Sequence, residues 1–180
     1  MKKFELTSET KINIFGKKLF RIKALISFGD VEAGETGGWV EKEGNVNQSG
    51  NAWVSGNAKV FGDAMVFGDA KVSGDAMVSG DAEVSGNAEV SGNAMVYGDA
   101  KVYGDAMVSG NADYTTIHGF GTQFRTTTFF RCKDKKVRVA CGCFFGTIPE
   151  FREQVKNTRK GKIAEEYLMI ADLMENHFEK

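Results

Sequence analysis

A six-residue repeat runs without interruption through the middle of this chain. From Gly50 to Gly110 a glycine recurs at every sixth position, followed each time by Asn or Asp and then by Ala. Val stands two residues after each Ala as far as Val108, and Tyr114 takes that place in the last repeat. Eleven such hexads follow one another without an insertion. This periodicity predicts a solenoid, in which copies of one small unit stack on each other.

Each hexad predicts a short β-strand followed by a corner. Ala and Val are two residues apart, so their side chains point to the same side of a strand, and the residues that flank Val point to the other side. Gly followed by Asn or Asp favours the positive φ that a sharp corner requires. Three corners close a triangular coil of about 18 residues, with Val and Ala inside it.

The order of the apolar residues also suggests a family. Val54 with Ala58, and Val60 with Ala64, place a small residue four positions after an aliphatic one. In this pattern residues 50–115 resemble the hexapeptide-repeat superfamily of left-handed parallel β-helices. The resemblance implies the same triangular solenoid.

The lead-in to the repeat carries a second, narrower resemblance. Residues 37–43, with residues 49–54 after them, look like the entry of YdcK-type β-solenoids, which are largely uncharacterised bacterial and phage or prophage proteins. Lys42 and Gln48 stand where the repeat would place Val. We therefore expect the first coil to be irregular or shifted in register.

A solenoid this short has two open ends, which need covering for stability and to block edge pairing. Residues 1–37 alternate apolar and polar positions around a turn at 15–18, which predicts an N-terminal β cap. Residues 38–115 form the solenoid. Residues 116–180 predict a ββαα domain, with strands at 126–132 and 137–143, a helix capped by Thr147 and Glu150, and a second helix over 162–178. The expected fold class is mainly β, a left-handed parallel β-helix between these two caps.

Outward-facing apolar residues predict contact between copies of the chain. Residues 18 apart share a face, and two adjacent faces are rich in aromatic residues and Met. Exposed apolar patches usually mark interfaces, so we expect a homo-oligomer, and the resemblance favours a trimer. The alternative is that these side chains stack in solvated ladders along the solenoid. The predicted interface residues are Phe61, Phe67, Met77, Met95, Tyr97 and Tyr103.

The segment 118–138, which includes the C-terminal hairpin, is the part of the chain richest in side chains that could bind a ligand. Arginine guanidinium groups and hydroxyls can hold a phosphate, and aromatic rings can stack on a base. The alternative is a hairpin with one solvated face, on which Arg packs against aromatic rings. The predicted ligand-binding residues are His118, Phe120, Arg125, Thr127, Arg131 and Arg138.

Neither a metal nor a cofactor is expected. The three cysteines are Cys132, Cys141 and Cys143, and the chain has two His. In a hairpin Cys132 would lie about 13 Å or more from the other two, so four zinc ligands are hard to assemble. The cysteines are better explained as small apolar residues.

The bulk composition limits the partners and the compartment. The chain has 23 Lys and Arg against 24 Asp and Glu, which gives no general attraction to double-stranded nucleic acid or acidic membranes. No apolar run reaches the roughly 20 residues of a membrane span. An odd, small number of Cys argues against a disulfide framework. We expect a cytoplasmic protein, located in the host cytoplasm if it is phage-encoded.

Function is less constrained than fold. Acyltransferases of the superfamily use a His general base on the solenoid and a loop insertion, but residues 38–115 contain neither. The favoured hypothesis is a non-enzymatic, phage-type binding protein, an oligomer whose C-terminal domains bind or sequester a small anionic, nucleotide-like ligand or a host factor. Evasion of host immunity would be its setting. The alternatives are an acyltransferase and a phage structural or assembly element.

Overall fold

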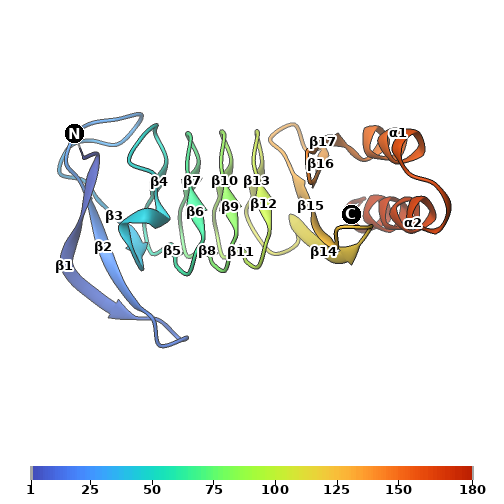
Figure 1. Ribbon diagram of the computed structural model, residues 1–180. Helices are drawn as coiled ribbons and strands as arrows, with labels where there is room; N and C mark the ends of the chain where they lie inside the picture. Colours follow the sequence, from blue (N-terminus) through green and yellow to red (C-terminus); the bar gives the residue numbers. More distant parts are fainter. Residues whose placement is uncertain (1, 180) are drawn as a thin grey trace.

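The computed structural model describes residues 2–179 and confirms a mainly β chain built on a parallel β-solenoid of about four turns (Figure 1). The strands of the solenoid are β3 (Thr36–Val40), β4 (Trp53–Val54), β5 (Lys59–Val60), β6 (Met65–Val66), β7 (Lys71–Val72), β8 (Met77–Val78), β9 (Glu83–Val84), β10 (Glu89–Val90), β11 (Met95–Val96), β12 (Lys101–Val102) and β13 (Met107–Val108).

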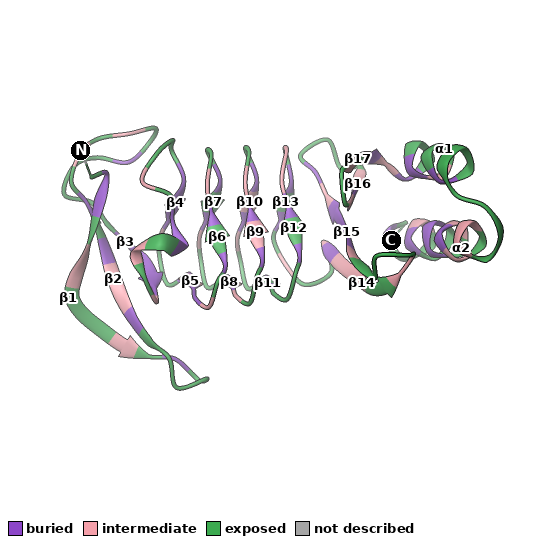
Figure 2. Cartoon of the chain, viewed as in Figure 1, coloured by how far each residue is buried: buried purple, intermediate pink, exposed green. Residues whose placement is uncertain are grey.

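The hexads build three faces, as predicted. Parallel pairing gives the strand orders β3-β5-β8-β11, β6-β9-β12 and β4-β7-β10-β13. Pairs such as Lys59 with Met77 and Met65 with Glu83 lie 18 residues apart in sequence. The Val and Ala of every hexad from Ala52 to Val108 are fully buried. Figure 2 shows buried segments on each coil of the solenoid. The repeat therefore forms a continuous apolar core.

The first coil is longer than the others, which confirms the predicted shift in register. Val40 pairs with Val60, twenty residues on, whereas Val54 pairs with Val72, eighteen residues on. A short 3-10 turn, η1 (Glu43–Asn45), lies within this first coil. Gln48 also lies there, and its side chain binds the backbone of Phe4 instead of filling the core.

The N-terminal segment forms the expected β cap. Strands β1 (Phe4–Ile12) and β2 (Lys18–Ala24) make an antiparallel hairpin, and β2 pairs with β3 of the first coil. Phe4, Ile22 and Val31 join the Val and Ala core and close the open end of the solenoid.

The C-terminal end is covered by a sheet that carries two helices. The predicted hairpin is β15 (Arg125–Arg131) with β16 (Val137–Cys141), and the structure adds a strand on each side, β14 (Tyr114–Phe120) and β17 (Phe144–Thr147). Helices α1 (Ile148–Thr158) and α2 (Gly161–Phe178) follow, and the predicted cap of Thr147 with Glu150 begins α1. The domain is therefore ββββαα.

This sheet is the middle layer of a sandwich. Phe130 and Ala140 point to the solenoid and belong to its core, while Phe129 and Val139 point the other way and pack with the helices. Figure 1 shows the sheet between the last coil and the helix pair. Among residues 2–179, no helix is both long and apolar enough to cross a bilayer.

The two ends of the solenoid present different backbone groups. Amides of one coil donate to Gly, Ala and Val carbonyls of the next coil, so the first coil has carbonyls that no earlier coil covers. Donor side chains of the cap, and of the irregular first coil itself, take the place of the missing amides. Asn45 Nδ2 donates to the Gly62 and Ala64 oxygens at 3.1 and 2.8 Å, and Arg21 Nη1 donates to the Gly56 oxygen.

At the opposite end the uncovered groups are amides, and acceptor side chains bind them. Asn111 Oδ1 accepts from the Met95 amide at 2.8 Å, and Thr128 Oγ1 accepts from the Lys101 amide at 3.0 Å. Asp113 accepts from the amides at 109 and 110. Each cap therefore matches the chemistry of its own rim.

Candidate functional site

The six predicted ligand residues do not gather in one place. Arg131 lies on the helix side of the sheet, where its Nη2 donates to the Phe178 oxygen at 2.7 Å. Neighbouring strands pair Arg138 with Phe130, whose ring faces the solenoid, and Arg138 Nη2 binds Asp134 at 2.7 Å. Two of the three predicted arginines are therefore engaged within the chain.

His118 lies apart from both. Its Nδ1 is 2.9 Å from Thr126 Oγ1, which also donates to Asp99 Oδ2 at 3.3 Å. The imidazole is exposed, at the boundary between the sheet and the last coils. It lines none of the cavities described below.

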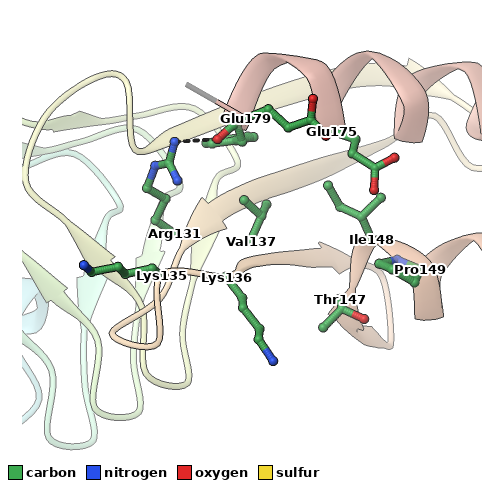
Figure 3. A pocket seen from close by; sticks show the side chains of 10 residues that line it. Arg131, Lys135, Lys136, Val137, Thr147, Ile148, Pro149, Glu175 and Glu179 are labelled. Carbon is green, nitrogen blue, oxygen red and sulfur yellow. Dashed lines mark hydrogen bonds between the residues drawn. The ribbon is translucent and has the colours of Figure 1, made fainter.

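One cavity of the C-terminal domain is a groove of about 500 Å³ at the ends of the helices (Figure 3). Val137, Ile148 and Phe178 give it an apolar floor, while Glu175 and Glu179 put carboxylates on its rim. Figure 3 shows Lys135 and Lys136 extending away from Val137 and Ile148. An anion in this groove would meet carboxylates as well as cations, which weakens the case for an anion site there.

A second cavity, of about 180 Å³, combines two arginines without any acid. We call it the arginine pocket. Arg125, at the start of β15, and Arg159, just after α1, line it together with half-buried Cys141, exposed Cys143 and Tyr167. The rest of its wall is formed by Phe144, Phe151, Gln154, Val155 and Thr158.

Neither guanidinium of the arginine pocket is neutralised by a carboxylate. Within residues 2–179, every ion pair closer than 4.0 Å involves other cations. Arg125 lies against Gly142, where an added Cβ would stand 2.5 Å from its Nη1. Arg159 Nη1 donates to the Thr158 oxygen at 3.3 Å. The pocket thus has positive charge and unused hydrogen-bond donors.

Hydroxyl and thiol groups lie in the wall of the pocket or directly behind it. Thr127, which is buried, donates from Oγ1 to Cys141 Sγ at 3.1 Å, and Tyr167 donates from its hydroxyl to the Phe120 oxygen at 3.2 Å. Burial raises the pKa of Tyr167, so its hydroxyl stays a donor at neutral pH. Of the predicted ligand residues, Arg125, Thr127 and Phe120 therefore lie in or next to this pocket.

Sequence reasoning missed Arg159 and Tyr167. Both belong to the helical segment, 18 and 26 residues beyond Cys141 at the end of the hairpin, and nothing in their local sequence marks them as ligand residues. Only the packing of the helices on the sheet brings them to Arg125.

The predicted interface residues also fall into two groups. Phe61 is buried with Leu19 and Trp39 beneath the N-terminal hairpin, and Met77 packs against them. The ring of Tyr103 packs against that of Phe145, with the ring centres 4.6 Å apart and the planes tilted by 35°. Phe67 is half-buried, whereas Met95 and Tyr97 remain exposed.

No cluster of three or more His, Cys, Asp or Glu that could hold a metal occurs among residues 2–179. Comparisons with protein-family models and with curated proteins find no match for this chain.

Proposed function

We propose that this protein binds a small anionic ligand, carrying a phosphoryl or carboxylate group, in the arginine pocket, and that it acts by binding and not by catalysis. The observation that carries the proposal is the pair Arg125 and Arg159, which face a cavity whose lining contains no Asp or Glu. Guanidinium groups bind such anions with paired, charge-assisted hydrogen bonds.

The size of the cavity refines the ligand class. A volume of about 180 Å³ is below the roughly 300 Å³ at which pockets begin to enclose drug-sized molecules. A phosphate group fits, while the sugar and base of a nucleotide would lie outside, near the rim. Nucleotide sequestration by a phage-type member of the hexapeptide-repeat superfamily remains the setting that we favour.

The test is a thermal-shift and calorimetric titration with inorganic phosphate, sulfate, and linear and cyclic nucleotides. We expect phosphate-bearing ligands to raise the melting temperature and the matching nucleosides to leave it unchanged. Arg125→Gln and Arg159→Gln should each weaken binding by roughly ten- to a hundredfold, since a hydrogen bond to a charged group is worth about 1.5–3 kcal/mol. Lys136→Gln, in the other groove, is the matched control.

Two outcomes would contradict this function. One is that no phosphate-bearing ligand shifts the melting temperature of the wild-type protein. The other is that both arginine variants bind these ligands with wild-type affinity, which would mean that the ligand binds outside the arginine pocket.

We also propose that the solenoid forms a homo-oligomer, with a trimer favoured, through the face that carries β8 and β11. Met95 and Tyr97 support this, because they are 43% and 59% exposed next to one another on that face. Sedimentation should give the mass of an oligomer, and the double variant Met95→Ser, Tyr97→Ser should lower that mass. Met107→Ser, on another face, should not. A wild-type monomer would refute the assignment.

Acyl transfer is the alternative, and the cluster of His118, Thr126 and Asp99 favours it over other enzymatic activities. His118 would be the general base. Turnover of acetyl-CoA above background that is lost in His118→Asn would replace the binding proposal with this enzyme.

A further inference from the structure

Two thiols line the arginine pocket, and neither takes part in the proposed anion site. Cys141 ends β16 and Cys143 precedes β17, with Gly142 between them at φ +60°. Glycine adopts this left-handed conformation readily, and the resulting tight turn brings both cysteines to one cavity. Cys143 is exposed, whereas Cys141 is half-buried and bonded to Thr127.

The charge around this turn selects among thiol reagents. Arg125 packs on Gly142, directly between the two cysteines, and Arg159 lines the same cavity. With no carboxylate in the lining, this environment attracts a reagent that carries negative charge and gives no advantage to a neutral one.

We propose that Cys143 is a reactive thiol that forms a mixed disulfide with small anionic disulfides, such as glutathione disulfide, whose carboxylates are held by Arg125 and Arg159. The inference rests on the anion-binding role of these arginines and adds a covalent modification site to it. Cys143 loses its proton to water, and its sulfur attacks one sulfur of the disulfide. The original S–S bond breaks, and the departing glutathione thiolate takes up a proton.

The other cysteines serve as internal comparisons. Cys132 is buried at the far end of the hairpin, and burial raises its pKa to about 11, so it holds almost no thiolate at pH 8. Cys141 is half-buried, and its sulfur accepts a hydrogen bond from Thr127. The fast-reacting thiol should therefore be Cys143 alone.

The test compares two chromogenic disulfides on the folded, full-length protein: dithionitrobenzoate, which is anionic, and dithiodipyridine, which is neutral. We expect Cys143→Ser to abolish the fast reaction and Cys141→Ser to preserve it. Arg125→Gln and Arg159→Gln should slow the anionic reagent by roughly tenfold and leave the neutral reagent unchanged. Lys136→Gln should alter neither rate. Mass spectrometry after incubation with glutathione disulfide should show one adduct, absent in Cys143→Ser.

Equal slowing of both reagents in the arginine variants, or a fast thiol other than Cys143, would overturn the inference. Phosphate titration of Cys143→Ser separates it from the proposed function. If phosphate binds through the arginines but Cys143 shows no preference for the anionic reagent, only the thiol inference fails. If neither phosphate binding nor reagent preference depends on the arginines, both fail.

Discussion

The ammonium nitrogen of Lys3 lies 2.8 Å from the carbonyl oxygen of Ala52, deep in the first coil of the solenoid. It also donates to the Gly50 oxygen at 3.2 Å and sits 4.7 Å from the centre of the Phe28 ring. Only 2% of Lys3 is exposed. One lysine thus supplies donors to two carbonyls that an earlier coil would otherwise cover.

Removing this ammonium should destabilise the protein. Lys3→Met keeps most of the side-chain volume and leaves the Gly50 and Ala52 oxygens buried without these donors, which costs on the order of 1–3 kcal/mol for each group. Chemical denaturation should show a lower unfolding midpoint than wild type. Lys23→Met, at an exposed position of β2, should stay within about 0.5 kcal/mol of wild type. Equal midpoints for the two variants would mean that water satisfies these carbonyls.

The same lysine should make stability depend on pH. Burial lowers the pKa of Lys3 to about 8, against 10.5 for an unperturbed lysine. Between these values the unfolded chain binds more protons than the folded one, so the stability that Lys3 contributes rises from pH 8 to pH 10.5. The free energy of unfolding of wild type minus that of Lys3→Gln should grow by up to about 3 kcal/mol over this range. The subtraction cancels groups common to both proteins, and a flat difference would contradict the shifted pKa.

Asn45 should be intolerant of a change that merely swaps its amide for a carboxylate. It is fully buried, its Nδ2 donates to two carbonyls, and its Oδ1 accepts from the Lys42 amide. Asn45→Asp replaces the donor with an acceptor and should cost roughly 2–4 kcal/mol. Asn57→Asp is the matched control, since other hexads carry Asp at this corner and no measurable loss is expected. Thermal unfolding of both variants checks the contrast.

Substitutions at two corner glycines can distinguish the cost of backbone strain from the cost of steric crowding between coils. Gly80 and Gly98 have nearly the same φ, +71° and +67°. A Cβ at Gly80 would stand 2.9 Å from the Gly98 nitrogen, whereas a Cβ at Gly98 would meet nothing within 4 Å. Gly98→Ala should therefore cost about 1–2 kcal/mol from φ alone, and Gly80→Ala should cost clearly more. Equal losses would show that the coils separate easily enough to admit a methyl group.

The solenoid was predictable because its determinants are local and repeated. Spacing alone assigned Val and Ala to the core and placed Lys59 and Met77 on one face, and both assignments are confirmed. The irregular first coil was also predictable, because Lys42 and Gln48 stand where the repeat would place Val. The side strand β17 was not, because its four residues run directly into the cap of α1.

Contacts between segments that are distant in sequence escaped prediction. Phe61 has the pattern of an exposed interface residue, but the N-terminal hairpin curls over it and buries it with Leu19. Arg125 was predicted from its own segment. Arg159 reaches the same pocket only because of where α1 ends relative to the sheet, and the sequence does not show that position. A period of six residues holds no information about either packing arrangement.

The unlike chemistry of the two rims bears on how large an assembly this chain can form. One rim is rich in carbonyl acceptors and the other in amide donors, so two bare solenoids would be complementary head to tail. Association of that kind does not close on itself and yields filaments. Five side chains occupy the groups through which such a filament would grow: Lys3, Arg21 and Asn45 at one rim, and Asp113 and Thr128 at the other. With these groups already bonded, neither rim offers a free backbone edge at those positions for a second solenoid to pair with.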